Sequence, residues 1–156
     1  MNRATSVLVA GTWDPTQATD RVLIDFDRRY RRRIVLPTES GAAVLLDLPQ
    51  AVRLRQGDGL ALEAGGVVHV LARPEPLLDI HCHDAATLVR IAWHLGNRHL
   101  PMQLDPQLTG AHIRIRADHV IAEMVQGLGG HVSAVQAPFD PEGGAYAAGH
   151  AHHHDD

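Results

Sequence analysis

The feature that most constrains the fold is a proline-rich break near the middle of the chain, Arg73-Pro74-Glu75-Pro76. Two prolines within three residues stiffen the backbone in an extended form and interrupt regular strand pairing. At 156 residues, the chain is long enough for two small domains. We therefore predict one domain over residues 1–73, a second over residues 77–139 and a C-terminal segment over residues 140–156.

Before the break, short apolar runs alternate with turn signals, a pattern that is typical of strands. Gly57-Asp58-Gly59 and Gly65-Gly66 supply residues for the positive φ angles that tight turns need. No catalytic constellation occurs in this half of the chain. The pattern predicts a small β-rich domain, with strands centred on residues 7–9, 22–24, 34–36, 43–46, 60–62 and 67–71.

After the break, strand and helix periods alternate. Residues 77–82 favour a strand, and Asp84 is placed to cap a helix that runs to about Leu95 and stops at Gly96. Asp118 is placed to cap a second helix. Further strands are predicted near residues 101–104, 112–115 and 131–137. Strand, helix, strand, strand, helix, strand is the ferredoxin-like (βαββαβ) order, so the whole chain is predicted to be α+β.

Composition argues against several classes of protein. The formal net charge of −4, with histidine counted as neutral, disfavours a protein that coats nucleic acid. No apolar run approaches the roughly 18 residues that span a bilayer. The N-terminus shows no secretory signal, and the single cysteine, Cys82, cannot form an internal disulfide. We therefore expect a cytoplasmic protein that binds neither nucleic acid nor membrane.

The chain ends in a histidine-rich tail, His150-Ala151-His152-His153-His154-Asp155-Asp156. Imidazoles and carboxylates this close together can coordinate a divalent metal, and nitrogen ligands suit nickel, copper or zinc better than calcium or magnesium. The alternative is a purification tag, which the irregular spacing disfavours. We therefore take His150, His152, His153 and His154 as candidate metal ligands.

A second histidine-containing run is His94-Leu95-Gly96-Asn97-Arg98-His99-Leu100-Pro101. His99 follows the predicted helix stop, which places its imidazole on a turn and not in a core. A transition metal generally needs four or more donors, so one such histidine is a poor site by itself. In a two-fold dimer, the same histidine near the axis would supply two ligands. The alternative is an ordinary surface histidine.

His119 lies in the first turn of the second predicted helix, where the helix dipole disfavours a protonated imidazole and leaves a ring nitrogen for a metal. The alternative is again a partly exposed surface histidine. His69, His112 and His131 have weaker claims, and we interpret them as structural.

Asp79-Ile80-His81-Cys82-His83 resembles the metal-binding strand of zinc amidohydrolases, because two histidines two residues apart on a strand face the same side. That fold is a barrel of about 250 residues that takes further ligands from later strands. Fewer than half that many residues follow here, so we do not expect an enzyme. An auxiliary metal contact at His81 and His83 stays open.

Residues 25–33 form a basic run around Tyr30. Such a run is usually a solvated strand edge. Among functional alternatives, an acidic protein partner is favoured over RNA, because flanking aspartates and the acidic total weaken attraction to phosphates.

The run from His94 to Pro101 reads as the His-Leu-Gly-Asn-Arg-His-x-Pro signature of the UreE family, the urease accessory proteins that act as nickel metallochaperones. Three further segments agree in order, and together they span most of the chain. They are the arginine-rich strand with Leu36-Pro37 and Leu54-Arg55-Gln56-Gly57-Asp58, then Asp118-His119-Val120 with Met124 behind it, and Pro138-Phe139-Asp140-Pro141-Glu142-Gly143-Gly144-Ala145-Tyr146 before the tail.

This resemblance implies a β-rich N-terminal domain similar to a peptide-binding module and a ferredoxin-like metal domain that forms a homodimer. His99 would be the nickel ligand at the dimer interface and His119 a second family histidine beside it. The tail histidines would extend metal capacity or complete the coordination sphere. The implied role is to deliver nickel to the urease apoprotein complex through an accessory GTPase. The competing hypothesis is a general zinc or copper buffer, because copper outcompetes nickel at most nitrogen sites.

Overall fold

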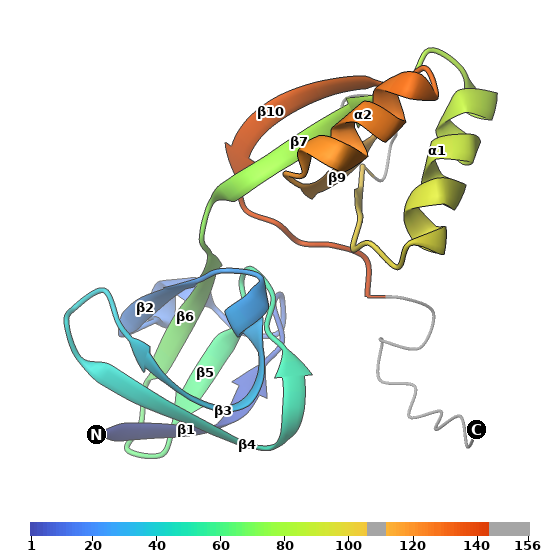
Figure 1. Ribbon diagram of the computed structural model, residues 1–156. Coiled ribbons are helices and arrows are strands. Elements are labelled where there is room, and N and C mark those ends of the chain that lie inside the picture. Colours follow the sequence, from blue (N-terminus) through green and yellow to red (C-terminus); the bar gives the residue numbers. More distant parts are fainter. Residues whose placement is uncertain (106–111, 144–156) are drawn as a thin grey trace, which may run out of the picture. The chain divides into compact units, whose positions relative to one another are not determined.

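The computed structural model describes residues 1–105 and 112–143, which divide into two compact units (Figure 1). The first unit comprises Met1–Glu75 and, from much later in the chain, Ala137–Asp140. The second comprises the described residues of Pro76–Gln136 and residues 141–143. The described residues form a strand-rich, mixed α+β protein, as the sequence predicts. Neither α-helix in this part of the chain is long and apolar enough to cross a membrane.

The first unit is a curled six-stranded sheet with the strand order β2-β6-β5-β1-β4-β3. Strand β1 runs parallel to β4 and β2 parallel to β6, whereas β1–β5, β3–β4 and β5–β6 pair antiparallel. Two 3-10 helices lie between strands. The elements are β1 (Asn2–Leu8), η1 (Pro15–Gln17), β2 (Asp20–Ile24), η2 (Asp27–Arg29), β3 (Tyr30–Pro37), β4 (Ala43–Arg53), β5 (Gly59–Leu62) and β6 (Val67–Ala72).

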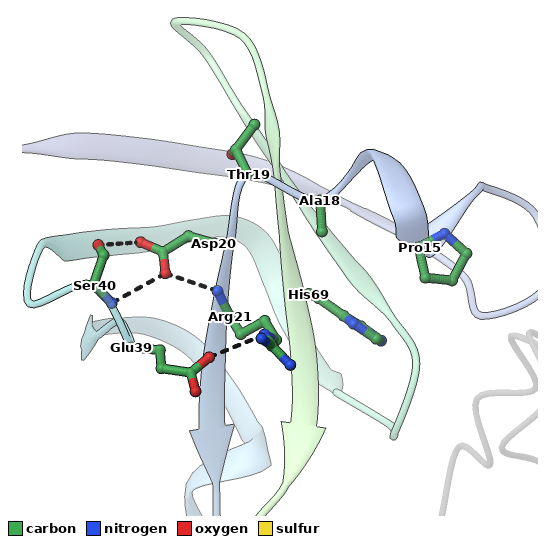
Figure 2. Close-up of a pocket in the computed structure, with 8 residues that line it drawn as sticks. All are labelled: Pro15, Ala18, Thr19, Asp20, Arg21, Glu39, Ser40 and His69. Carbon is green, nitrogen blue, oxygen red and sulfur yellow. Dashed lines mark hydrogen bonds and ion pairs between the residues drawn. The ribbon is translucent and has the colours of Figure 1, made fainter.

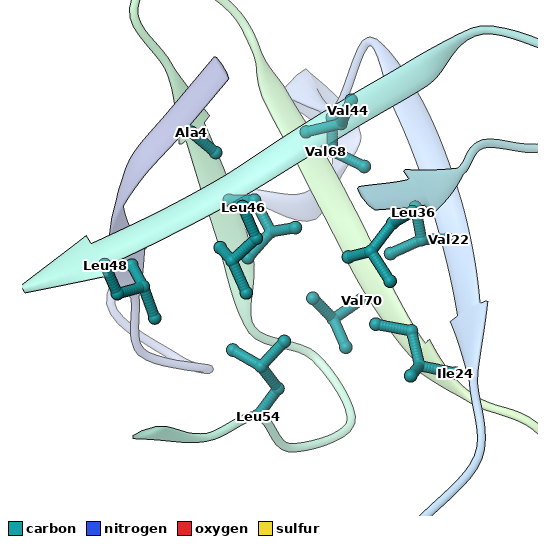
Figure 3. Close-up of a cluster of buried hydrophobic side chains, with 11 residues drawn as sticks. Ala4, Val22, Ile24, Leu36, Val44, Leu46, Leu48, Leu54, Val68 and Val70 are labelled. Carbon is teal, nitrogen blue, oxygen red and sulfur yellow. The ribbon is translucent and has the colours of Figure 1, made fainter. Parts of the chain in front are cut away.

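Alternation along the strands builds the core of this unit. In β6, Val68, Val70 and Ala72 are buried, while the residues between them are only partly buried. Side chains from β1, β2, β3, β4 and β6 converge in the same way (Figure 3). On the exposed side of the sheet, Arg3 bridges Asp47 and Glu63. The inward-facing positions of β6 are therefore apolar, while its other face is only partly buried, the alternation expected of a half-buried strand.

The glycine turns are confirmed at Gly57, Gly65 and Gly66, whose φ angles are 92°, 97° and 95°. Gly59 has a different role. It opens β5, where a Cβ would lie 2.7 Å from Cγ1 of Val67 and 2.8 Å from the ring of Trp13. Close packing, and not turn geometry, therefore requires glycine at this position.

The second unit packs two α-helices on one face of a four-stranded sheet. The strand order is β10-β7-β9-β8, and β9 runs antiparallel to both β7 and β8. One core joins the buried residues of α1 and α2 to those of β7 and β9. The elements are β7 (Glu75–His81), α1 (Ala85–Asn97), β8 (Gln103–Leu104), β9 (Ile113–Arg116), α2 (His119–Gly127) and β10 (His131–Ala137).

Both predicted helix caps are confirmed. Oδ1 of Asp84 accepts a hydrogen bond from the N–H of Thr87 at 2.7 Å, and Oδ1 of Asp118 accepts one from the N–H of Val120 at 2.9 Å. The predicted stop of the first helix at Gly96 is wrong, because α1 continues to Asn97. His99, and not the glycine, takes the left-handed conformation that follows the helix.

The break between the two halves is shorter than predicted. Strand β7 begins at Glu75, so only Arg73 and Pro74 separate it from β6. Oε2 of Glu75 accepts a hydrogen bond from the backbone N–H of Phe26 at 2.9 Å. This glutamate therefore anchors the end of the first unit and does not lie in a free linker.

The basic run is a solvated strand edge, as predicted, at Arg31, Arg32 and Arg33 on the edge strand β3, but not at Arg29. Arg29 is only 1% exposed and donates a hydrogen bond to the carbonyl of Phe139. Phe139 is itself fully buried and packs edge-on against Phe26, with ring centroids 5.2 Å apart. Arg55 adds an ion pair to Asp140 at 2.9 Å. Residues 137–140, which span the predicted end of the second domain and the start of the C-terminal segment, therefore pack with the first unit.

Candidate metal site

His99 lies in the turn after α1, and its backbone decides how its imidazole is presented. Its φ of 56° is in the left-handed region, which residues other than glycine rarely adopt. The N–H of His99 donates to the carbonyl of Gly96 at 3.0 Å, and that of Leu100 donates to the carbonyl of Leu95 at 3.2 Å. Leu100 packs against the core, whereas His99 is exposed. The turn thus fixes the backbone while the imidazole faces solvent.

His119 is the first residue of α2 and is exposed, which confirms its predicted place in the first turn. The adjacent Asp118 carboxylate already accepts hydrogen bonds from the N–H groups of Val120 at 2.9 Å and Ile121 at 3.2 Å. The cap therefore uses the carboxylate. The imidazole of His119 is the group here that suits a transition metal.

One cleft connects the two histidine-bearing segments. It has a volume of about 280 Å³. Residues 100–101, directly after His99, and residues 117–118, directly before His119, line it together with apolar side chains from β9 and α2. The structure thus brings to one cleft two segments that are some twenty positions apart in the sequence.

A single chain offers few metal donors in the part that the structure describes. Over residues 1–105 and 112–143, no three histidine, cysteine, aspartate or glutamate side chains lie close enough to hold one ion. The candidate ligands His150, His152, His153 and His154 lie outside the described residues. A site at His99 therefore needs donors from the tail, from a second copy of the chain or from both.

Helix α1, which leads into the His99 turn, carries exposed apolar side chains. Val89 is 67% exposed and Trp93, one turn later, is 62% exposed. They line a groove with Ala85, Ala86 and Arg90. Val120, beside His119, is 59% exposed. Apolar side chains exposed in this way are typical of surfaces that associate with another protein.

Two family profiles match the chain in tandem. Residues 4–73 match the N-terminal domain of the UreE urease accessory protein, and residues 75–156 match its C-terminal domain. The chain belongs to the UreE family. This membership confirms the resemblance found in the sequence and makes the chain an accessory protein of urease, not itself an enzyme.

Relatives named urease accessory protein UreE match over most of the chain. The protein of Bradyrhizobium sp. strain BTAi1 is 53% identical over 157 residues, covering 100% of this chain and 74% of the relative. That of Rhodopseudomonas palustris strain HaA2 is 54% identical over 133 residues, covering 85% and 60%. That of Beijerinckia indica is 47% identical over 155 residues, covering 99% and 87%. The chain is thus shorter than these UreE relatives.

The histidines at the end of β7 do not form one site in this UreE-family chain. His81 packs its ring against His112, with centroids 4.8 Å apart, whereas His83 faces His131. Cys82, between them, is buried, and burial raises the pKa of its thiol. With no third ligand in the described part of the chain, the two histidines lack the donor set of a zinc hydrolase. Sequence reasoning paired His81 with His83 and missed these cross-strand partners.

A polar pocket of about 470 Å³ lies on the first unit, and sequence reasoning did not find it (Figure 2). The carboxylate of Asp20 accepts hydrogen bonds from the hydroxyl of Ser40 at 2.5 Å and the N–H of Arg21 at 2.9 Å. Hydrogen bonds from Ser40 and Thr38 lower the pKa of Asp20 to about 2. Arg21 pairs with Glu39 at 2.9 Å. The lining comes from separate segments of the UreE N-terminal domain, so no local motif could have indicated it.

Proposed function

We propose that this chain is a nickel metallochaperone that delivers nickel for assembly of the urease active site and binds the ion at a homodimer interface. Family membership supports the link to urease. The observation that carries the metal site is the exposed imidazole of His99, held on a hydrogen-bonded left-handed turn. A metallochaperone ligand must both bind and release its ion. It therefore needs a fixed backbone and an accessible ring.

We place the ion between two copies of the chain because one copy supplies too few metal ligands. His99 alone gives one nitrogen, and a two-fold axis beside it would give two. The exposed apolar side chains of α1, Val89 and Trp93, supply a surface for such self-association close in sequence to the turn. Burying them between two copies would remove from water the largest apolar groups that α1 exposes.

Further ligands would come from His119 and from the tail. The shared cleft supports a contribution by His119, because the segments that carry His99 and His119 both line it. We assign His150, His152, His153 and His154 to completing the coordination sphere or raising its capacity. No bond to a substrate is made or broken, and the ion would leave by exchange of imidazole ligands.

We assign metal binding to the second unit and partner binding to the first. In the second unit, the element order and the strand order β10-β7-β9-β8 support a ferredoxin-like metal-binding and dimerisation domain over residues 77–139. The β-rich domain over residues 1–73 would bind a partner. The partners proposed are the urease accessory GTPase and the urease apoprotein complex, and the cytoplasmic location stays a prediction.

Nickel titration by calorimetry tests this function. The intact chain is compared with His99→Ala and with the control His81→Ala, which removes another exposed histidine. The tightest phase is expected to saturate near one ion per two chains, to survive in His81→Ala and to disappear in His99→Ala. A His99→Ala protein that titrates like the parent would refute the interface site. A tightest phase that is equally strong with zinc or copper and selects no nickel in metal competition would favour the buffer hypothesis.

A further inference from the structure

A pair of facing imidazoles lies outside the proposed nickel site. His83 follows β7, and His131 opens β10, the strand next to β7 in the sheet. The two Nε2 atoms are 2.7 Å apart, and the rings meet at 82° with centroids 4.6 Å apart. Both residues are exposed. Strand pairing therefore holds two accessible nitrogens at contact distance, although 48 positions separate them in the sequence.

A single proton can explain this distance. Two nitrogens this close share one hydrogen, so one Nε2 donates and the other accepts, and the two neutral rings are opposite tautomers. Two imidazolium rings would place two N–H groups against each other. One hydrogen therefore lies between the two Nε2 atoms, where a metal ion could also lie.

A divalent metal ion can take the place of that proton. Bonds from zinc to imidazole nitrogen are about 2.0–2.1 Å long, so two ligand nitrogens on one ion lie about 2.9 Å apart at a right angle and about 3.3 Å apart at the tetrahedral angle. The present 2.7 Å needs an opening of only a few tenths of an ångström, which exposed side chains provide by small rotations. Each ring would then carry its proton on Nδ1.

The neighbouring pair of histidines does not share this property. Nδ1 of His112 accepts a hydrogen bond from the backbone N–H of Cys82 at 3.1 Å, so in the neutral ring the proton must sit on Nε2. Neither nitrogen of His112 can bind a metal without losing that bond or that proton. His81 packs on this ring. His81 and His112 are therefore structural, and they serve as internal controls for His83 and His131.

Charge next to the pair also favours a cation. The carboxylate of Asp84 is adjacent to His83 in the chain, and its Oδ1 accepts a hydrogen bond from the N–H of Thr87. This carboxylate caps α1 and is not needed as a ligand. It supplies a negative potential at short range.

We propose that His83 and His131 form a second metal site, which takes one divalent transition-metal ion of the nickel, copper or zinc class per chain. Water fills the remaining coordination positions, so the site is open and weaker than one closed by four protein donors. Because each chain carries its own pair, this site would bind one ion per chain. The proposed His99 site would bind one ion per two chains, so the two are separable by stoichiometry.

Imidazole NMR of the ¹⁵N-histidine-labelled full chain, titrated with Zn²⁺, tests the proposal. Without metal, His83 and His131 are expected to be opposite tautomers. With metal, both should show a ligated Nε2 and a protonated Nδ1, while His81 and His112 keep their signals. His83→Gln should remove the response of His131, and His131→Gln that of His83, with one ion fewer per chain in equilibrium dialysis. His81→Gln should change neither.

Two results would overturn the second site. One is a spectrum in which the His83 and His131 rings stay unchanged at Zn²⁺ concentrations far above those that saturate the tighter phase. The other is a His131 ring that still responds in His83→Gln. Neither result bears on His99, whose loss is read from the phase that saturates at half an ion per chain. Melting temperatures equal to that of the parent would show that the glutamine variants are folded.

Discussion

The two units treat their polar groups differently. In the described chain, the buried polar residues Arg29, Thr38 and Asp58 all belong to the first unit. Asp58, for example, accepts hydrogen bonds from the N–H groups of Ala10 at 2.9 Å and Arg55 at 2.8 Å. In the described part of the second unit, the exposed histidines lie at or near strand ends, at the start of α2 or in the turn after α1; they are His81, His83, His99, His119 and His131. Internal polar bonds hold the first unit together, whereas the second leaves its imidazoles accessible for binding.

This difference separates stability from metal binding. Substitutions in the buried polar and aromatic contacts of the first unit should lower stability and leave the metal sites intact. Substitutions of exposed histidines should abolish metal binding at little cost to the fold. The predictions below test both halves of this comparison.

The largest effect is expected for Phe139→Ala. This fully buried ring packs against Phe26, and truncating a buried phenylalanine costs about 3–5 kcal/mol. The free energy of unfolding from urea denaturation measures the loss. Trp93→Ala is the matched control. It removes a ring that is 62% exposed, so at chain concentrations low enough to keep the protein monomeric it should cost less than about 0.5 kcal/mol. At higher concentrations it should weaken self-association on gel filtration. Similar losses in the two variants would contradict the assignment of Phe139 to a core.

A smaller effect is expected at the helix caps. Asp84→Ala and Asp118→Ala each remove hydrogen bonds to the first turn of a helix and should cost about 1 kcal/mol. Thermal melts give both losses. The variants should differ in the nickel phase that saturates near one ion per two chains, because among the two caps only that of α2 adjoins a candidate ligand of the proposed His99 site, His119. Equal affinities for that phase in the two variants would remove His119 from the proposed site.

Features of the fold and of the candidate metal site could be predicted from the sequence where neighbouring residues determine them. Both helix caps follow from an aspartate before an apolar helical period, and the positive φ angles of Gly57 and Gly65 follow from turn composition. Local signals of this kind need no knowledge of the rest of the chain. The metal-site candidates came from a contiguous motif and a contiguous tail, and the metal assignments stay predictions.

Contacts between distant segments could not be predicted in this way. Nothing near Arg29 in the sequence indicates that the carbonyl of Phe139, 110 positions later, would accept its hydrogen bond. The pairing of His83 with His131 depends on which strand neighbours β7, and the polar pocket of Figure 2 depends on several strands at once. His81 and His83 were paired in the sequence because only their spacing of two residues was visible, whereas β7 ends at His81.

His99→Gly should raise the stability of the fold and abolish tight nickel binding. A side chain at φ 56° carries a conformational penalty of about 1–2 kcal/mol, from which the extra backbone entropy of glycine in the unfolded chain subtracts about 0.5–1 kcal/mol. The net expectation is a gain of about 0.5–1 kcal/mol in unfolding free energy together with loss of the tight nickel phase. His99→Ala should lose nickel equally without the gain in stability. A glycine variant less stable than the alanine variant would show that a Cβ at position 99 carries no net conformational penalty in this turn.

The smallest effect concerns the pocket carboxylate of the first unit. Because the folded-state pKa of Asp20 is lowered from 3.8 to about 2, its ionised form stabilises the fold above pH 4, and that contribution is lost as the pH falls through about 2. Ser40→Ala removes the hydrogen bond that contributes most to this shift. Because the carboxylate is near solvent, the cost at pH 6 should stay under about 1 kcal/mol. Melting temperatures of the parent and Ser40→Ala should therefore differ at pH 6 and converge near pH 2. If the difference in melting temperature were as large at pH 2 as at pH 6, the Ser40 hydroxyl would act through neutral contacts. The charge on Asp20 would then not be what stabilises this pocket.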